Sequence, residues 1–320
     1  MEEELKFADV LDRLLTGEEP SISLVYRLSD MAPTEMEAFL ERWPQGTEVR
    51  RRAIARHMAD ISEENFVVDF SPVFHRLLSD SSAEVRLAAL DGLWDSSNTA
   101  VVSPIIRLMQ GDPDEAVRAA AAATLGHFVL MGEWGKIAPK VADPIVEALL
   151  QVYEGGDEPA VRRAALESLG NAAHPRVEKL IDDAYRQGEE EMQLSALFAM
   201  GRSADRRWLP VLVDEMRSPR AERRMEAARA AGNIGHSDPV DRLLQLLDDE
   251  DLEVQLAAVT ALGQIGSETA REGLARLLDD PEAYLLYDAV EDALEEIEWL
   301  GAEVDLTLFD WSEDEDDILE

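Results

Sequence analysis

A unit of about 31 residues repeats in register along most of this chain, and this period constrains the fold more than any other feature. The clearest copies are VRRAALESLG (Val161–Gly170), MQLSALFAMG (Met192–Gly201), RRMEAARAAG (Arg223–Gly232) and VQLAAVTALG (Val254–Gly263). Their first residues are 31 positions apart three times in succession. A fixed period in this range is typical of a solenoid, in which each repeat packs against its neighbours.

The residue nine positions before the recurring glycine is termed the anchor of its copy. The anchors are Val49, Val85, Val117, Val161, Met192, Arg223, Val254 and Leu286. In the copy that starts at Val254, small apolar residues recur at the spacing of one helix face. A second apolar helix precedes the anchor helix, and an acidic loop such as Asp248–Asp251 separates the two. The wider gaps between anchors are interpreted as loop insertions, for example Phe128–Lys140.

Neither helix of a unit could bury its apolar face alone, so neighbouring pairs must stack. The sequence therefore predicts an all-α fold, a right-handed α-solenoid of helix pairs without β-sheet. Residues 1–48 do not fit the period but have helical patterning, and we expect them to form a helical N-terminal cap. The repeat solenoid should cover residues 49–300, and an acidic C-terminal tail should follow at 301–320.

The pattern resembles the HEAT-repeat family, and its short period and the form D…VRxxAAxxLG look most like the HEAT-like repeats of bilin lyases. The resemblance covers roughly Val49 to Leu300. It implies an Asp and an Arg six residues apart that stack between repeats as a hydrogen-bonded ladder. The pairs that match are Asp80 with Arg86 and Asp112 with Arg118.

The later copies depart from this ladder pattern. Asp157 and Arg162 are one residue closer than the pattern requires, and glutamine replaces arginine at Gln193 and Gln255. The resemblance therefore implies a ladder that is broken in the later copies.

The composition excludes several classes of partner. The chain has 30 basic and 68 acidic residues among 320, a net charge of −38, which disfavours nucleic acid and anionic membranes. It has no cysteine and no apolar run of about 18 residues, and its acidic N-terminus, MEEELKFADV, lacks the basic region and apolar core of a signal peptide. We therefore expect a cytoplasmic protein that does not contact membranes.

No constellation of residues indicates chemistry. The five histidines form no pair at metal-binding spacing, and neither a phosphate-binding loop nor a nucleophile motif is present. His174 and His236 share one repeat position, where they could be ligands on two repeats or polar turn residues, and we favour turn residues. We expect no catalytic residue, no metal site and no cofactor.

The solvent-facing stripe of each anchor helix is predicted at anchor +2, +6 and +10. The stripe contains Arg163, Glu167 and Asn171, then Leu194, Phe198 and Arg202, then Met225, Arg229 and Asn233, then Leu256, Thr260 and Gln264. Apolar residues rimmed by arginine and amides are typical of a protein-binding site on the concave face. Alternatively, these apolar residues pack between helices.

Two clusters of arginine could attract an acidic segment, or could simply be ladder and surface residues. They are Arg50, Arg51, Arg52 and Arg56, and Arg220, Arg223, Arg224 and Arg229. Beyond Arg276 the chain has no basic residue, and 18 of its last 44 residues are acidic. Trp311 lies among those acids, which suggests a docking segment, in cis or in trans, as well as a solvated tail.

The sequence favours a non-enzymatic protein-binding scaffold or adaptor, whose protein partner could be basic. The alternative is a chaperone-like bilin lyase subunit that acts on a tetrapyrrole and a carrier protein. The sequence does not identify the partner or the oligomeric state.

Overall fold

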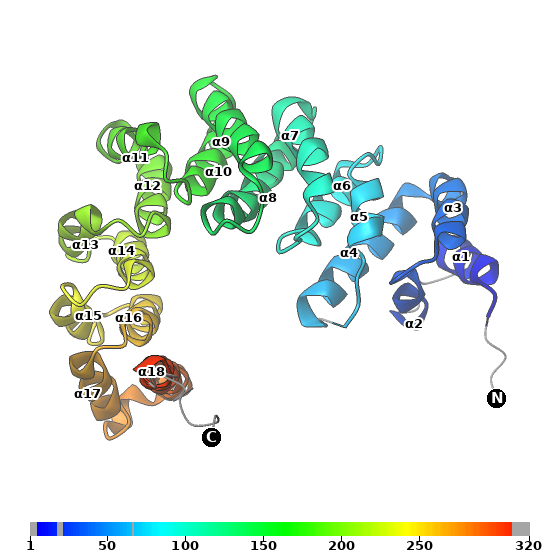
Figure 1. Ribbon diagram of the computed structural model, residues 1–320. Coiled ribbons are helices and arrows are strands. Elements are labelled where there is room, and N and C mark those ends of the chain that lie inside the picture. The colour runs from blue at the N-terminus through cyan, green and yellow to red at the C-terminus, as the bar shows by residue number, and fades with distance from the viewer. Residues whose placement is uncertain (1–4, 18–21, 66, 309–320) are drawn as a thin grey trace, which may run out of the picture. The chain divides into compact units, whose positions relative to one another are not determined.

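The computed structural model describes residues 5–17, 22–65 and 67–308, and for residues 300–308 it describes the backbone alone. The prediction of an all-α solenoid is confirmed, because helices fill these ranges and none of the residues in them forms a β-strand. The chain forms two compact units, Met1–Val177 and Glu178–Glu320 (Figure 1).

The first unit begins with a helical block that leads into the repeats. Its helices are α1 (Phe7–Thr16), α2 (Ile22–Val25), η1 (Tyr26–Leu28), α3 (Pro33–Arg42), η2 (Trp43–Gln45), α4 (Glu48–Glu64), α5 (Ser71–Leu77), α6 (Ala83–Asp91), η3 (Thr99–Val101), α7 (Val102–Gly111), α8 (Glu115–Glu133), α9 (Pro139–Glu154) and α10 (Pro159–Leu169). Helices α1 and α2 pack against α4. That arrangement suits an N-terminal cap, which stays a prediction.

The second unit continues the alternation of helices. Its helices are α11 (Pro175–Gln187), whose first residues still belong to the first unit, α12 (Glu190–Arg202), η4 (Arg206–Trp208), α13 (Leu209–Glu215), α14 (Ala221–Ile234), α15 (Val240–Leu246), α16 (Leu252–Ile265), α17 (Glu268–Leu277), η5 (Pro281–Leu286) and α18 (Tyr287–Leu308).

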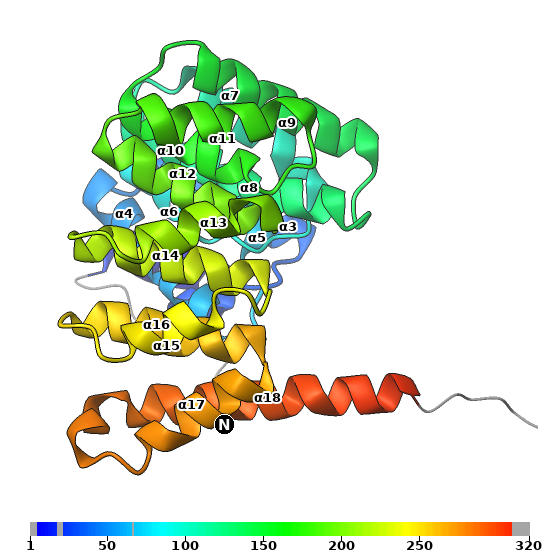
Figure 2. The ribbon, with the colours of Figure 1, turned by 90° about the vertical axis from the view of Figure 1, so that its left-hand side faces the viewer.

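Within each unit the helices form two layers. The anchor helices α4, α6, α8 and α10 pack in sequence in the first unit, as α12, α14, α16 and α18 do in the second. Helices α13, α15 and α17 form the other layer of the second unit (Figures 1 and 2). Contacts are extensive along the anchor layer and sparse along the other layer.

Glycine explains the tight packing of the anchor layer. A Cβ atom added at Gly232 would lie 2.8 Å from the Cα of Ala261, and one added at Gly201 would lie 2.6 Å from the Cα of Ala230. Gly263 makes the same approach to Ala293. In each case the glycine at anchor +9 contacts the alanine at anchor +7 of the next copy. The same register therefore recurs along α12, α14, α16 and α18.

A ladder of arginine and aspartate links the loops that precede the anchor helices of the first unit. Arg86 donates to the carbonyl oxygen of Asp80 at 2.8 Å and to the carboxylate of Asp112 at 2.7 Å. Arg118 repeats the pattern, with 2.7 Å to the carbonyl oxygen of Asp112 and 3.1 Å to the carboxylate of Asp157. Each arginine therefore ties its own loop to the loop of the next repeat.

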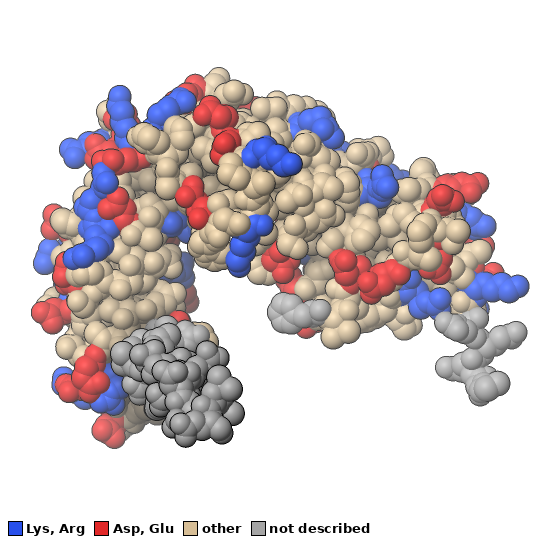
Figure 3. All heavy atoms as spheres, viewed as in Figure 1, with Lys and Arg blue, Asp and Glu red and all other residues tan. Residues whose placement is uncertain are grey.

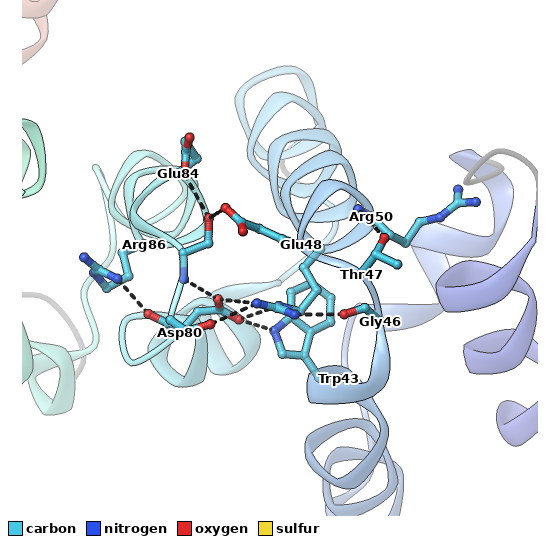
Figure 4. Close-up of polar contacts among 11 residues, drawn as sticks. Trp43, Gly46, Thr47, Glu48, Arg50, Asp80, Glu84 and Arg86 are labelled. Carbon is cyan, nitrogen blue, oxygen red and sulfur yellow. Dashed lines mark hydrogen bonds and ion pairs between the residues drawn. The ribbon is translucent and has the colours of Figure 1, made fainter.

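The first rung of the ladder shows that the predicted register of the first copy was wrong by one residue. Arg51 donates to both carboxylate oxygens of Asp80, at 3.0 and 3.2 Å (Figure 4). Trp43 donates to the same carboxylate at 2.6 Å. The predicted anchor Val49 is 75% exposed, because the true anchor position falls at Arg50, one residue before the ladder arginine.

The ladder is interrupted in the later copies, as predicted, because Arg162 donates to the carbonyl oxygen of Tyr153 and Gln193 accepts from Arg223.

One rung in the second unit was not predicted. Arg224 donates to the carbonyl oxygen of Ser218 at 3.0 Å and to the carboxylate of Asp249 at 2.6 and 2.7 Å. Gln255 then donates to the carbonyl oxygen of Asp249 at 2.7 Å. A rung needs only the arginine and the aspartate of the following repeat, because the residue six positions back contributes its carbonyl group.

Two segments are more helical than predicted. Only residues 134–138 of Phe128–Lys140 lie between helices, because α8 continues to Glu133, where it buries Phe128 and Val129, and α9 begins at Pro139. At the other end of the chain, α18 passes the predicted boundary at residue 300 and ends at Leu308. The rest of the predicted tail, residues 309–320, lies outside the described residues.

We expect Ala258→Asp to destabilise the protein severely. The Ala258 side chain is fully buried in α16, and a carboxylate there would lose its hydration without gaining a partner. The cost should be about 3 kcal/mol or more of unfolding free energy. Thermal melting checks this result against Thr260→Asp, an exposed site on the same helix. Equal melting temperatures for the two variants would contradict the assignment of the buried face.

We expect Asp80→Asn to destabilise the protein by about 3 kcal/mol at neutral pH, because it leaves the buried Arg51 without its counter-ion. Burial alone would raise the pKa of Asp80, but hydrogen bonds from the Ser82 N–H, Arg51 and Trp43 lower it. A carboxyl group whose pKa is lower in the folded state stabilises the protein above its unfolded pKa of about 4. This stabilisation is lost on acidification.

The difference between wild type and Asp80→Asn should therefore shrink as the pH falls below about 4. Urea unfolding at a series of pH values measures it. Asp60→Asn removes an exposed partner of Arg56 and serves as the control, with little effect at any pH. A penalty for Asp80→Asn that does not change with pH would contradict the proposed role of the Asp80 carboxylate.

Candidate protein-binding surface

The predicted stripe lies on one face of the anchor layer in the second unit. All nine of its residues on α12, α14 and α16 are exposed or half-buried: Leu194, Phe198, Arg202, Met225, Arg229, Asn233, Leu256, Thr260 and Gln264. They point away from the buried alanines because +2, +6 and +10 occupy the opposite side of each helix. The alternative, that the apolar members pack between helices, does not hold for Phe198, which is 37% exposed.

The centre of this face combines an aromatic ring with two cations. The guanidinium of Arg202 lies 5.9 Å from the ring centroid of Phe198, one helical turn away on α12. Arg229 on α14 is exposed, and its side chain has no hydrogen bond or ion pair with any described residue. None of the nine stripe positions on these three helices is acidic. An exposed apolar surface beside a cation can bind an apolar group and an anion of the same partner.

The charge pattern of the second unit separates its two layers. In Figure 3, which views α14 and α16 nearly end-on, the charged side chains of this unit gather mainly along the α13, α15 and α17 edge.

On α10, in the first unit, the equivalent stripe positions do not all face solvent. Arg163 and Glu167 are half-buried, which agrees with the prediction of a solvent-facing stripe. Asn171 is buried, contrary to prediction, and donates to the carbonyl oxygen of Gly126 at 3.1 Å. The reason is that α10 ends at Leu169, so helical spacing does not apply at anchor +10.

An acidic row on α18 was not recognised from the sequence. Counting +2, +6 and +10 from the anchor Leu286 gives Asp288, Asp292 and Glu296, and all three are exposed. The stripe was counted only as far as the copy that starts at Val254, and extending it to the next copy would have identified these three acids. The layer α12, α14, α16, α18 therefore changes from cationic and apolar to acidic within one repeat.

Most of the arginines that the sequence grouped into two clusters are engaged within the protein. In the first cluster, Arg50 donates to the carbonyl oxygen of Gly17, Arg51 belongs to the ladder and Arg52 pairs with Glu84. In the second cluster, Arg220 pairs with Glu190, Arg223 with Glu215, and Arg224 with Asp249. Arg229 is the member of the second cluster that faces solvent without such a partner.

The two histidines at equivalent repeat positions act in turns. The Nδ1 atom of His174 accepts the backbone N–H of Arg176 at 3.3 Å, and that of His236 accepts the N–H of Asp238 at 3.2 Å. Within the described ranges, no group of three or more His, Cys, Asp or Glu residues is placed to hold a metal ion.

Two other candidate binding features, a hollow beside α13 and Trp311, do not extend this surface. A shallow hollow of about 550 Å³ lies beside α13 in the other layer and is lined by Arg206, Leu209, Pro210 and Val213. Trp311, the last predicted binding residue, lies outside the described residues, so its contact stays a prediction. Among the described helices, none is long and apolar enough to cross a bilayer.

Solved structures share the general architecture. The chain is 19% identical to the YibA protein of Escherichia coli, with a TM-score of 0.42 over 75% of this chain and 95% of that one. It is 21% identical to a chain of the CpcE–CpcF complex of phycocyanin lyase from Nostoc, with a TM-score of 0.48 over 72% and 94%. It is 16% identical to human deoxyhypusine hydroxylase, with a TM-score of 0.37 over 91% of this chain and 96% of that one. These likenesses concern the fold alone.

No curated protein has a sequence that matches this chain significantly. The sequence profile of HEAT repeats, however, matches residues 70–149, 146–226 and 209–295, which together cover more than half of the chain. The chain belongs to the HEAT-repeat family.

Proposed function

We propose that this protein is a non-enzymatic scaffold that binds a protein partner on the α12–α14–α16 face. The observation that carries the proposal is the array of nine outward-facing stripe residues, which contains exposed Phe198 and unpaired Arg229 and no acid. A solenoid offers such a face because its repeats place equivalent positions side by side. HEAT-repeat architecture supports a role in protein interactions.

The residue types on the face define the chemistry of its partner. Leu194, Met225 and Leu256 form an apolar row at anchor +2 across the three helices, and Phe198 lies one turn further along α12. Each of the four is exposed or half-buried. Arg202 and Arg229 lie one turn further along α12 and α14 than Phe198 and Met225. A partner segment with two or three apolar anchors and a carboxylate beside them would match both rows. A segment with a basic end could also reach the acidic row on α18.

The alternative function, a chaperone-like bilin lyase subunit, requires a site that holds a tetrapyrrole. Absorbance titration of the protein with a bilin tests it directly. A stoichiometric spectral change would favour the lyase, whereas a spectrum equal to that of the free bilin would remove it.

To test the binding face, a photo-crosslinking amino acid at position 198 would first identify the partner in an extract of the native host. Calorimetry with the purified partner would then compare wild type with Phe198→Ala plus Met225→Ala. We expect each substitution to cost on the order of 2 kcal/mol, or roughly 30-fold in affinity.

The matched control truncates exposed apolar residues elsewhere in the second unit. Tyr284→Ala plus Leu285→Ala serves this purpose, since the two side chains are 65% and 58% exposed in η5. The control should retain wild-type affinity. Unchanged affinity in the Phe198 and Met225 variant, with its melting temperature preserved, would reject this face as the binding site.

A further inference from the structure

We propose that the first unit contains a second binding site, a hollow at the ends of α4 and α6 that takes an arginine side chain from a basic segment of a partner protein. The hollow lies in the other compact unit from the α12–α14–α16 face, so this inference does not depend on the binding face proposed above. It adds a basic segment to the ligands that the protein can recognise.

The hollow lies where α4 and α6 end and α5 begins, and its volume is about 330 Å³. Helices α4 and α6 pack side by side (Figure 1), and the ladder contact between Arg51 and Asp80 lies where these two helices begin. Pockets for small ligands have volumes of about 300–1,000 Å³. This hollow therefore has room for one side chain or a small molecule, but not for a helix.

The walls of the hollow carry carboxylates and no cation. Twelve described residues line it, and none of them is Lys, Arg or His. Asp69 and Asp95 are both exposed. The Asp95 carboxylate makes no hydrogen bond or ion pair with any described residue, and the Asp69 carboxylate accepts a single bond, from the N–H of Ser71 at 2.8 Å. Both carboxylates therefore lack a counter-ion within the part of the chain that the structure describes.

The helices around the hollow add to its negative potential. Helix α4 ends at Glu64 and α6 ends at Asp91, and the C-terminal end of a helix carries a partial negative charge. Two further exposed acids, Glu63 and Glu64, lie in the last turn of α4. The site therefore favours a cation over a neutral or anionic ligand.

Apolar groups in the lining suit the stem of a long basic side chain. Val68, Phe70 and Pro72 line the hollow together with the carboxylates. Lysine and arginine pack their methylene groups on such surface while the charged end contacts polar groups. A metal ion would gain nothing from these apolar residues, so the lining favours an organic cation.

Arginine fits the hollow better than lysine does. Its planar guanidinium has five N–H donors and binds carboxylates bidentately, whereas lysine has three donors on one atom. The acceptors come from two segments of the chain, Asp69 before α5 and Asp95 and Ser97 after α6. Trp94, which directly precedes Asp95, is 52% exposed, and a guanidinium stacks favourably on a tryptophan ring.

The exposure of Trp94 follows from the early end of α6. The same position of the later copies is a glycine that packs against the next anchor helix. Helix α6 ends at Asp91, three residues before Trp94, so this position is no longer held in a helix. The tryptophan therefore stays at the surface, next in sequence to the carboxylate without a partner.

The charge of the whole chain assists capture of a basic segment. A net charge of −38 attracts cations at long range and raises their association rate at low ionic strength. That attraction does not distinguish one acidic region from another. The carboxylates without counter-ions and the apolar lining provide the selectivity of the hollow.

The test uses two probes that differ in charge and hardly in shape, N-acetyl-arginine amide and N-acetyl-citrulline amide, in which a urea group replaces the guanidinium. Nuclear magnetic resonance of the ¹⁵N-labelled full chain follows the backbone N–H signals of Ser97 and Asn98 and the indole N–H signal of Trp94. The indole signal is identified by its absence from the Trp94→Phe variant.

We expect saturable shifts of these signals with the arginine probe and a dissociation constant on the order of millimolar, since a single side chain makes few contacts. The citrulline probe should bind at least about tenfold more weakly, because its hydrogen bonds to the carboxylates are not charge-assisted on the donor side.

The two carboxylates are tested with a matched control. Asp69→Asn plus Asp95→Asn should weaken binding of the arginine probe at least about tenfold, and asparagine at position 69 can still accept the N–H of Ser71. Glu63→Gln plus Glu64→Gln removes the same charge from the last turn of α4 without altering the lining, and should change affinity less than about twofold. Unchanged melting temperatures verify that both double variants fold.

Equal weakening by the two double variants would overturn the proposal, since it would indicate a response to net charge alone. Equal affinity for the two probes would indicate a site for a neutral polar ligand instead. Displacement of the arginine probe by micromolar Ca²⁺ would indicate a metal site. Shifts that do not saturate by about 50 mM would show that no specific site exists. Each of these results would leave the α12–α14–α16 face untouched.

Discussion

The close contact between a glycine of one anchor helix and an alanine of the next determines the rest of the second unit. Gly201, Gly232 and Gly263 let successive helices approach until backbone meets backbone, and no larger side chain fits there. Because the contact always joins anchor +9 to anchor +7, it fixes the relative height and rotation of the helices. The positions +2, +6 and +10 are then left on the outside of every helix. The binding face is thus a consequence of how the layer packs.

In the second unit the rung of Arg224 holds the opposite ends of α14 and α16. Arg86 and Arg224 each join the backbone of one loop to the carboxylate of the next, so a repeat that slid or rotated would lose two bonds at once. Burial of an ion pair contributes little net stability, since desolvation offsets most of the attraction. The ladder is better understood as a device that fixes register. Glycine contacts and ladder together leave the anchor layer little freedom to rearrange.

The sequence predicted the features that depend on periodicity and missed those that depend on local exceptions. The period identified the helices and the outward-facing stripe, because a register repeated four times averages out deviations in any one copy. It failed at Val49, where the first copy is shifted by one residue, and at Asn171, where α10 ends before the stripe position is reached. The rung of Arg224 was missed because its carbonyl partner belongs to Ser218 rather than to an aspartate.

The charge of the chain shapes how such a face selects its ligands. A net charge of −38 repels an acidic segment at long range, so such a segment associates slowly unless it is tethered or carries apolar anchors. At contact distance the balance reverses, because Arg229 is unpaired and none of the nine stripe positions on α12, α14 and α16 is acidic. Long-range repulsion with short-range attraction discriminates against acidic chains in general. It favours a ligand whose apolar residues lie beside its carboxylates.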